Sequence, residues 1–108
     1  MTTAGRLDAL LKLHQAEPDD AELLYMIGLE HAKAGDHPAA ADWLSRATAA
    51  NPAHHYAYYQ LAKALHANDQ TPEALATLDA GVARAQQDQN AKAIGELQEL
   101  KDQIELDA

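Results

Sequence analysis

The chain has no cysteine and no phenylalanine, and only one of its 108 residues is tryptophan. Without cysteine it can form no disulfide bond, no thiolate metal site and no cysteine nucleophile. β-Branched aliphatic residues are also scarce, with one valine and three isoleucines. Because sheets are normally rich in such residues, their scarcity beside abundant alanine and leucine predicts an all-α protein.

Basic residues are few: 8 lysines and arginines stand against 17 aspartates and glutamates, for a formal net charge of −9. A chain without clustered positive charge repels nucleic-acid phosphates and anionic lipid, so we expect neither as a partner. No stretch approaches the ~20 apolar residues of a membrane-spanning helix. The first seven residues also lack the basic start and apolar core of a signal peptide. We therefore expect a soluble cytoplasmic protein.

What the chain does contain is an internal repeat, because it matches itself at an offset of 34 residues. Pro18 and Pro38 return as Pro52 and Pro72. Between these prolines, residues of the same size class recur: Leu24-Tyr25 as Tyr58-Tyr59, Ile27-Gly28 as Leu61-Ala62, Ala40 as Ala74, Leu44 as Leu78, and Ala47 as Gly81. Such a period is typical of a helix-turn-helix solenoid, whose repeats bury their apolar faces against their neighbours.

Hydrophobic periodicity and helix-breaking residues predict six helices in one domain. The first is expected over about residues 6–16 and the last over about 89–106. Asp19 or Asp20 is the expected N-cap of the second helix, and Gly35 is expected to end it. Small residues are expected where paired helices cross closely, namely at Gly28, Ala40, Ala47, Ala62, Ala74 and Gly81.

These residues resemble the tetratricopeptide repeat, a 34-residue unit of two antiparallel helices. The first repeat spans residues 21–54 and the second 55–88, while 5–20 and 89–106 resemble capping half-repeats. The second repeat lacks the closing proline, since Gln86 stands there. The residues that carry the resemblance are Leu24, Ile27, Gly28, His31, Ala40, Leu44, Ala47 and Pro52 in the first repeat, and Tyr58, Leu61, Ala62, Leu65, Ala74, Leu78 and Gly81 in the second.

The resemblance implies a right-handed superhelix whose concave groove is lined mainly by the first helix of each repeat. It also implies a non-catalytic adaptor or scaffold that binds a peptide or helix of another protein in that groove. Carried over to this chain, the expected partner-binding residues are Tyr25, Leu29, Lys33, Tyr56, Tyr59, Lys63 and His66, with Glu22, Ala32 and Ala67 also lining the groove.

The tyrosines are the sharpest signal within this set. Tyr58 is expected in the core, because its counterpart one repeat earlier is Leu24. Tyr25, Tyr56 and Tyr59 offer rigid contact area with a polar tip to a ligand, or else pack against the adjoining helix. Lys63, with Lys33, is expected to pair with an acidic group of the ligand.

Other functions of this family or of these residue types find less support. Some relatives bind chaperone C-termini through a carboxylate clamp of lysines and asparagines. This chain has Tyr25, Leu29 and Gln60 at the matching positions, and Lys63 is its only well-placed cation. The chain has six histidines, of which His31 and His66 occupy adjacent solenoid positions, but no His-Glu-x-x-His motif. With neither a nucleophile elbow nor a phosphate-binding glycine loop, we expect no metal, no cofactor and no enzymatic activity.

The last predicted helix raises two further interpretations. Its acidic row at a spacing of three forms either a solvated face or a surface that recognises a basic segment: Glu96, Glu99, Asp102 and Glu105. Self-assembly is the alternative function, as a homodimer formed through the solenoid ends or through the last helix. In the second case Leu97, Leu100 and Ile104 would form the seam.

Overall fold

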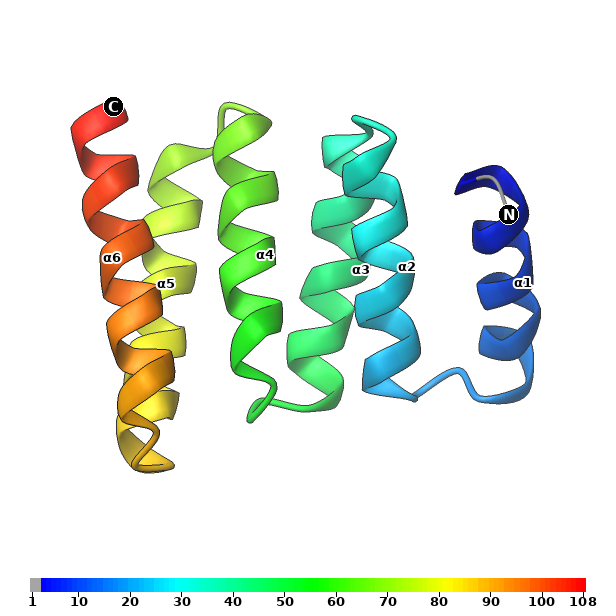
Figure 1. Ribbon diagram of the computed structural model, residues 1–108, viewed down its shortest axis with the longest axis horizontal. Coiled ribbons are helices and arrows are strands. Elements are labelled where there is room, and N and C mark those ends of the chain that lie inside the picture. Colours follow the sequence, from blue (N-terminus) through cyan, green and yellow to red (C-terminus); the bar gives the residue numbers. More distant parts are fainter. Residues whose placement is uncertain (1–2) are drawn as a thin grey trace.

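A computed structural model describes residues 3–108, and these form six α-helices without any strand (Figure 1). The helices are α1 Thr3–Ala16, α2 Ala21–Lys33, α3 His37–Ala50, α4 His55–Ala67, α5 Thr71–Gln87 and α6 Ala91–Asp107. The predicted all-α class and the six helices are therefore confirmed. Met1 and Thr2 belong to the N-terminal segment that lacks the features of a signal peptide, and they lie outside the described residues. Within the described range, no helix has the length and apolar character needed to cross a membrane.

Side-chain caps explain where three of these helices begin. Each cap accepts a hydrogen bond from the backbone amide three residues further on: Asp20 from Leu23 at 3.1 Å, Asp36 from Ala39 at 3.2 Å, and Asn90 from Ala93 at 3.0 Å. Of the two aspartates considered for the second helix, Asp20 is thus the N-cap. Gly35 follows α2 with a φ of 79°, a left-handed conformation that favours glycine.

The helices follow one another as antiparallel pairs along the long axis of the molecule (Figure 1). In one layer α4 contacts both α2 and α6, and α3 and α5 lie behind it. Each predicted repeat holds one helix pair, α2 with α3 and α4 with α5. The result is an all-α helical repeat solenoid whose extents are 36 × 29 × 20 Å.

The core is a succession of small apolar clusters. The largest lies between α4, α5 and α6 and contains Ala62, Ala74, Leu78, Ala85, Ala93, Leu97, Leu100 and Ile104. Two glycines mark the closest helix crossings: a Cβ added at Gly28 would lie 2.6 Å from Leu44 Cγ, and one at Gly81 would lie 2.9 Å from Tyr58 Cβ. The expectation that small residues permit close packing is confirmed at these two crossings.

Burial of these leucines bears on the predicted dimer seam. Leu97, Leu100 and Ile104 are between 2% and 6% exposed, because they pack against α4 and α5 of the same chain. A helix of a second molecule could pack along all three side chains only if this core opened. The prediction of a seam through these three residues is therefore wrong.

The first helix is attached in part by charge. Glu30 of α2 is only 3% exposed, and its Oε1 accepts from Arg6 Nε at 3.1 Å and from Lys33 Nζ at 3.4 Å. Arg6 comes from α1, so the pair joins two helices. The apolar contact beside it is small, with Leu10, Leu23 and Ile27 as its buried residues.

A ring cluster completes the contact between α1 and the first helix pair. The edge of His14 meets the Trp43 ring at a centroid distance of 5.0 Å, and the Arg46 guanidinium lies 4.2 Å from the centroid of the same ring. Arg46 Nη2 also lies 3.4 Å from His14 Nε2. Trp43 is half-buried, whereas Leu44 beside it is fully buried, so Leu44 is the core residue of α3.

Candidate binding groove

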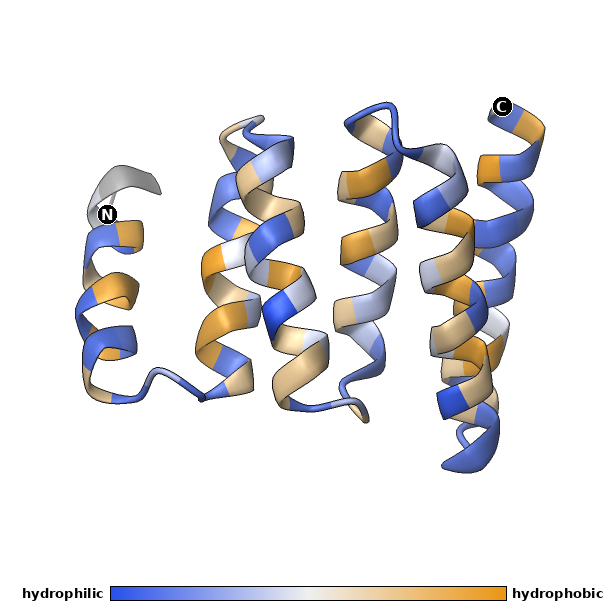
Figure 2. Cartoon of the chain, turned by 180° about the vertical axis from the view of Figure 1, so that it is seen from behind, coloured by the Kyte–Doolittle hydropathy of each residue, from blue (hydrophilic) through white to orange (hydrophobic). Residues whose placement is uncertain are grey.

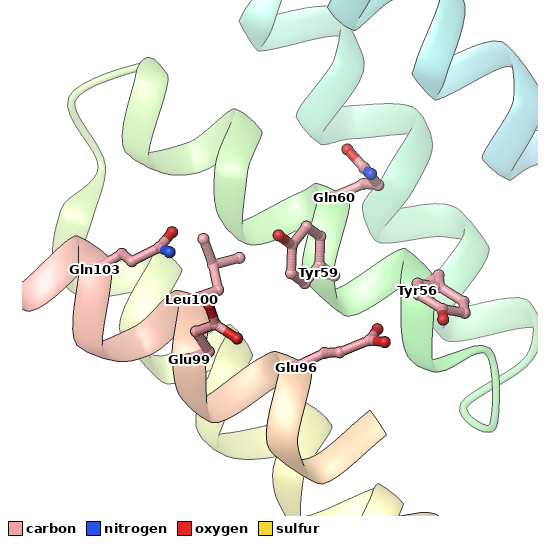
Figure 3. Close-up of a pocket in the computed structure, with 7 residues that line it drawn as sticks. All are labelled: Tyr56, Tyr59, Gln60, Glu96, Glu99, Leu100 and Gln103. Atoms are coloured by element: carbon pink, nitrogen blue, oxygen red, sulfur yellow. The ribbon is translucent and has the colours of Figure 1, made fainter. Parts of the chain in front are cut away.

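Aromatic, amide and carboxylate side chains line a hollow of about 360 Å³ between α4 and α6 (Figure 3). One wall comes from α4 and the other from α6, and together they comprise Tyr56, Tyr59, Gln60, Glu96, Glu99, Leu100 and Gln103. A narrow recess next to it reaches His55, Ala93 and Leu97. The α6 wall is absent from the predicted set of binding residues, although Glu96 and Glu99 belong to the acidic row noted in the sequence.

The two tyrosines of the hollow have unused hydroxyl groups. Tyr56 is 48% exposed, and Tyr59 is half-buried with its ring against the core cluster of α4–α6. Neither hydroxyl has a hydrogen-bond partner within residues 3–108. Both are therefore available to a ligand as donors and acceptors.

Tyr58 has a different role, as predicted. Its ring lies against Gly81 and the core cluster of α4–α6, and its hydroxyl donates to the Pro52 carbonyl at 3.0 Å. Burial raises the pKa of Tyr58, an effect that Arg84 opposes and Asp88 reinforces. Tyr58 therefore packs against the core, whereas Tyr56 and Tyr59 line the hollow.

Tyr25 lies on α2 and outside the α4–α6 hollow. Its ring centroid is 4.4 Å from that of His54, and His54 Nε2 donates to Glu22 Oε2 at 3.0 Å. Burial, followed by the charges of Glu22 and Tyr56, raises the pKa of Tyr25 and keeps it neutral. Tyr25 thus connects α2 to His54, just before α4, as the packing interpretation expects.

Lys63 and His66 extend the groove along α4. With Leu100, Gln103 and Asp107 they line a second hollow of about 300 Å³, which shares Leu100 and Gln103 with the first. Lys63 Nζ lies 5.9 Å from the Tyr59 ring centroid, and no carboxylate of the described chain lies within 4 Å of it.

His66 is held between two helices. Its Nε2 donates to Asp107 Oδ2 at 2.6 Å, and its Nδ1 lies 2.8 Å from Thr71 Oγ1. His66 of α4 therefore contacts both the end of α6 and the first residue of α5. Lys63 is the cation of this part of the groove that is open to a ligand.

The other two predicted residues lie on α2. Leu29 is half-buried, and Lys33 is engaged by Glu30 of its own helix. Lys63 also lines a hollow of about 200 Å³ with Ala32, His37 and Ala67, so this shallow surface reaches from α4 to α2 and the start of α3. Of the predicted binding residues, four lie on α4: Tyr56, Tyr59, Lys63 and His66. The other three lie on α2: Tyr25, Leu29 and Lys33.

The acidic row does not form one face of α6. Successive residues of an α-helix are about 100° apart, so a spacing of three rotates each residue by about 60° from the last. Glu96 and Glu99 accordingly line the hollow, while Asp102 and Glu105 are exposed elsewhere on the helix. Helical geometry applied to the residue numbers would have shown that the four residues cannot share one face.

The histidines provide no metal site. His31 stacks on Trp43 at a centroid distance of 6.4 Å, whereas His66 bonds Asp107, so these two do not approach one another. His54 and His55 diverge, toward Glu22 and Asp88 respectively. Throughout the part of the chain that the structure describes, no group of three or more histidine or carboxylate ligands converges.

Comparison with known proteins identifies the same repeat. A tetratricopeptide repeat model matches residues 31–97, more than half of the chain, and a second such model matches residues 4–55. A crystal structure of a tetratricopeptide repeat domain protein from Salinibacter ruber is 27% identical, covers 80% of this chain and 96% of that one, and has a TM-score of 0.72. A solution NMR structure of such a protein from the same organism is also 27% identical, with coverages of 82% and 89% and a TM-score of 0.73. No curated protein matches the chain.

Proposed function

The chain belongs to the tetratricopeptide repeat family, and from this we propose that it is a non-catalytic adaptor that binds a peptide or helix of a partner protein in the groove along α4 and α6. Proteins of this family generally act as scaffolds for protein–protein interaction. The observation that carries the proposal is the α4–α6 hollow, lined by two tyrosines whose hydroxyls have no partner in the described chain.

These tyrosines suit a binding surface for a physical reason. A tyrosine offers a large apolar ring with only two rotatable side-chain bonds, so little conformational entropy is lost when a ligand packs on it. Tyr56 and Tyr59 project from one rigid helix, and Tyr58 between them anchors that helix to the core. Such preorganised aromatic residues commonly carry most of the energy of an interface.

The remaining predicted residues extend this surface. Lys63 lies about one helical turn beyond Tyr59 and pairs with an acidic group of the ligand. Tyr25, Leu29 and Lys33 lie on α2, and Ala32 of the same helix lines a shallow hollow with Lys63. A partner long enough to cross from α6 to α2 would contact both sets.

The test is affinity capture from a host lysate with wild type and two variants, each first shown to be folded by circular dichroism. The groove variant is Tyr56→Ala/Tyr59→Ala/Lys63→Glu. The control is Asp42→Ala/Gln86→Ala, at exposed positions of α3 and α5. We expect a partner that wild type and the control retain and that the groove variant loses. A partner retained equally by all three would place binding elsewhere and refute the groove.

Self-assembly through the solenoid ends stays the alternative function. The burial of the α6 leucines argues only against a dimer formed through the last helix. Exposed Leu13 on α1 and exposed Leu106 on α6 favour it weakly. Multi-angle light scattering separates the two proposals. We expect a monomer across a hundredfold range of concentration, whereas a tight dimer would support assembly.

Two further expectations belong to the proposal. We place the adaptor in the cytoplasm, which the absence of cysteine from the sequence supports. We also exclude nucleic acid and membrane as partners, because a net charge of −9 repels phosphate groups.

A further inference from the structure

We propose that the α4–α6 hollow binds a positively charged side chain, arginine or lysine, of the partner segment. The inference rests on the proposed function and specifies the chemistry of its ligand. The ligand segment must then carry a basic residue. This conclusion follows from the charged and aromatic side chains that line the hollow.

The two carboxylates of the hollow are poorly neutralised within the chain. Figure 3 shows Glu96 extending from α6 toward Tyr56, with Glu99 and Leu100 on the same wall. Glu99 has no cation within 4 Å among residues 3–108, and Glu96 Oε1 is 4.0 Å from Lys92 Nζ. Lys92 is 78% exposed at its side chain, and an exposed pair at that distance contributes little. A ligand cation would therefore find two available acceptors.

No lysine or arginine is among the residues that line the hollow, and two of those residues are glutamates. Lys101 of α6 donates to Asp79 of α5 at 2.8 Å, which holds its charge away from the groove. Lys63 lies at the end where the second hollow begins, with its Nζ 5.9 Å from the Tyr59 ring centroid. The first hollow is thus a negative site in a chain of net charge −9, and both features attract a basic segment.

The tyrosines and Leu100 fit the rest of an arginine or lysine side chain. A cation is attracted to the face of an aromatic ring, here that of Tyr56, because Lys63 Nζ already lies over the Tyr59 ring. The apolar stem of either residue can lie on Leu100. The unpartnered hydroxyls of Tyr56 and Tyr59 can accept hydrogen bonds from guanidinium or ammonium donors. A hollow of about 360 Å³ has room for such a side chain together with part of its backbone.

The position of Lys63 adds a prediction about ligand sequence. Tyr59 and Lys63 are four residues apart, which is about 6 Å along a helix. An extended chain advances about 3.3 Å per residue, so an acidic ligand residue that pairs with Lys63 would lie about two residues from the basic one. In a helical ligand the same separation corresponds to about four residues.

The experiment is a selection from a displayed library of random decapeptides, followed by calorimetry on the most enriched peptide. The charge variant is Glu96→Gln/Glu99→Gln. Its matched control is Asp102→Asn/Glu105→Gln, which removes the same charge from the exposed part of the same helix. The peptide's basic residue is also replaced by a neutral analogue, citrulline for an arginine or norleucine for a lysine. Circular dichroism first confirms that each variant is folded.

We expect the selection to enrich arginine or lysine. The Kd should be about tenfold weaker for the charge variant and for the neutral peptide, since charge-assisted hydrogen bonds are among the strongest. The control variant should bind within about twofold of wild type. Equal weakening by both variants would mean that net charge, not the hollow, attracts the peptide, and would overturn the inference.

Two further outcomes separate this inference from the proposed function. The selection could yield peptides without a basic residue that bind wild type but not Tyr56→Ala/Tyr59→Ala. That result would overturn cation recognition and leave the groove as the binding site. Peptides that bind this tyrosine variant as well as wild type, or a library that yields no binder, would overturn both.

Discussion

The two terminal helices dock on the solenoid by different chemistry. α6 covers α4 and α5 through a continuous apolar cluster in which Leu97, Leu100 and Ile104 are buried. α1 contacts α2 beside a cluster of three buried residues and gains the Arg6–Glu30 ion pair and the His14–Trp43 ring contact. The hydropathy colouring in Figure 2 shows the apolar residues of α1 as separate patches among polar ones.

This difference predicts different stabilities for the two ends. Apolar burial contributes about 25 cal/mol for each Å² removed from water, whereas an ion pair with an exposed partner contributes about 0–1 kcal/mol. α6, which forms one wall of the groove, should therefore open only with the global unfolding of its neighbours. α1 should open locally while the remaining helices stay folded.

Truncation of one leucine at each end should show the contrast most strongly. Leu97→Ala should lower the free energy of unfolding by about 2–5 kcal/mol, because it leaves a cavity in the largest cluster. Leu10→Ala should cost about 2 kcal/mol, at the lower end of that range, and its effect should be confined to α1. Urea denaturation and amide hydrogen exchange would measure both. Faster exchange of α4–α6 in Leu10→Ala would contradict the comparison.

Two glycines of the C-terminal half differ in the space around their Cα atoms, and alanine substitution would test this difference. Gly81→Ala should lower stability by about 1–3 kcal/mol, because its Cβ would lie 2.9 Å from Tyr58 Cβ and 3.3 Å from Leu97 Cδ1. Gly95→Ala is the matched control, since nothing lies within 4 Å of its Cβ. It should raise stability by about 0.5–1 kcal/mol through helix propensity. Thermal melts with opposite shifts would confirm this, and two similar shifts would refute it.

The charged contact of α1 can be removed without touching its apolar residues. Arg6→Ala should lower the free energy of unfolding by about 1 kcal/mol and should accelerate amide hydrogen exchange in α1. Lys33→Ala is the control, because Lys33 lies on the same helix as Glu30 and cannot tether α1. An equal effect of both variants on α1 would show that the ion pair is not what holds this helix.

The smallest effect concerns pH in the C-terminal half. Hydrogen bonds from His55 and Arg84 lower the pKa of Asp88 from its usual value of 3.8. A lowered pKa means that the folded state binds protons less readily, so the stabilisation is present above 3.8 and lost as the pH falls through the lower, folded value. Asp88→Asn should thus be less stable than wild type at pH 5, and this difference should shrink as the pH falls below 3.8. A difference that stays the same below pH 3.8 in urea denaturation would contradict this linkage.

Much of the fold could be predicted because its signals are local and repeated. Gly35 and the aspartates act within one turn of their own helix, and Tyr58 inherits its core position from Leu24 by the 34-residue offset. These inferences need only helix geometry and the identity of neighbouring residues. They therefore depend little on how distant helices meet.

The charged contacts and one wall of the candidate groove could not be predicted in that way. The burial of Glu30 depends on Arg6, which lies in another helix, and no local pattern connects the two. The α4 face of the hollow follows from the repeat, but the α6 wall depends on how α6 is rotated against α4 and α5. That rotation is set by the packing of Leu97 and Leu100, and it brings Glu96 and Glu99 to the groove.

The order of helix contacts along the solenoid also determines how the molecule should respond to force. Within residues 3–108, every helix–helix contact joins helices that are adjacent or next but one in the chain. Tension applied to the two ends would therefore load one interface after another, as in unzipping, because no contact clamps the ends together. The molecule should unfold under force in several small steps that begin at α1. It should refold quickly when the force is removed, because each helix regains its contacts by closing only a short loop.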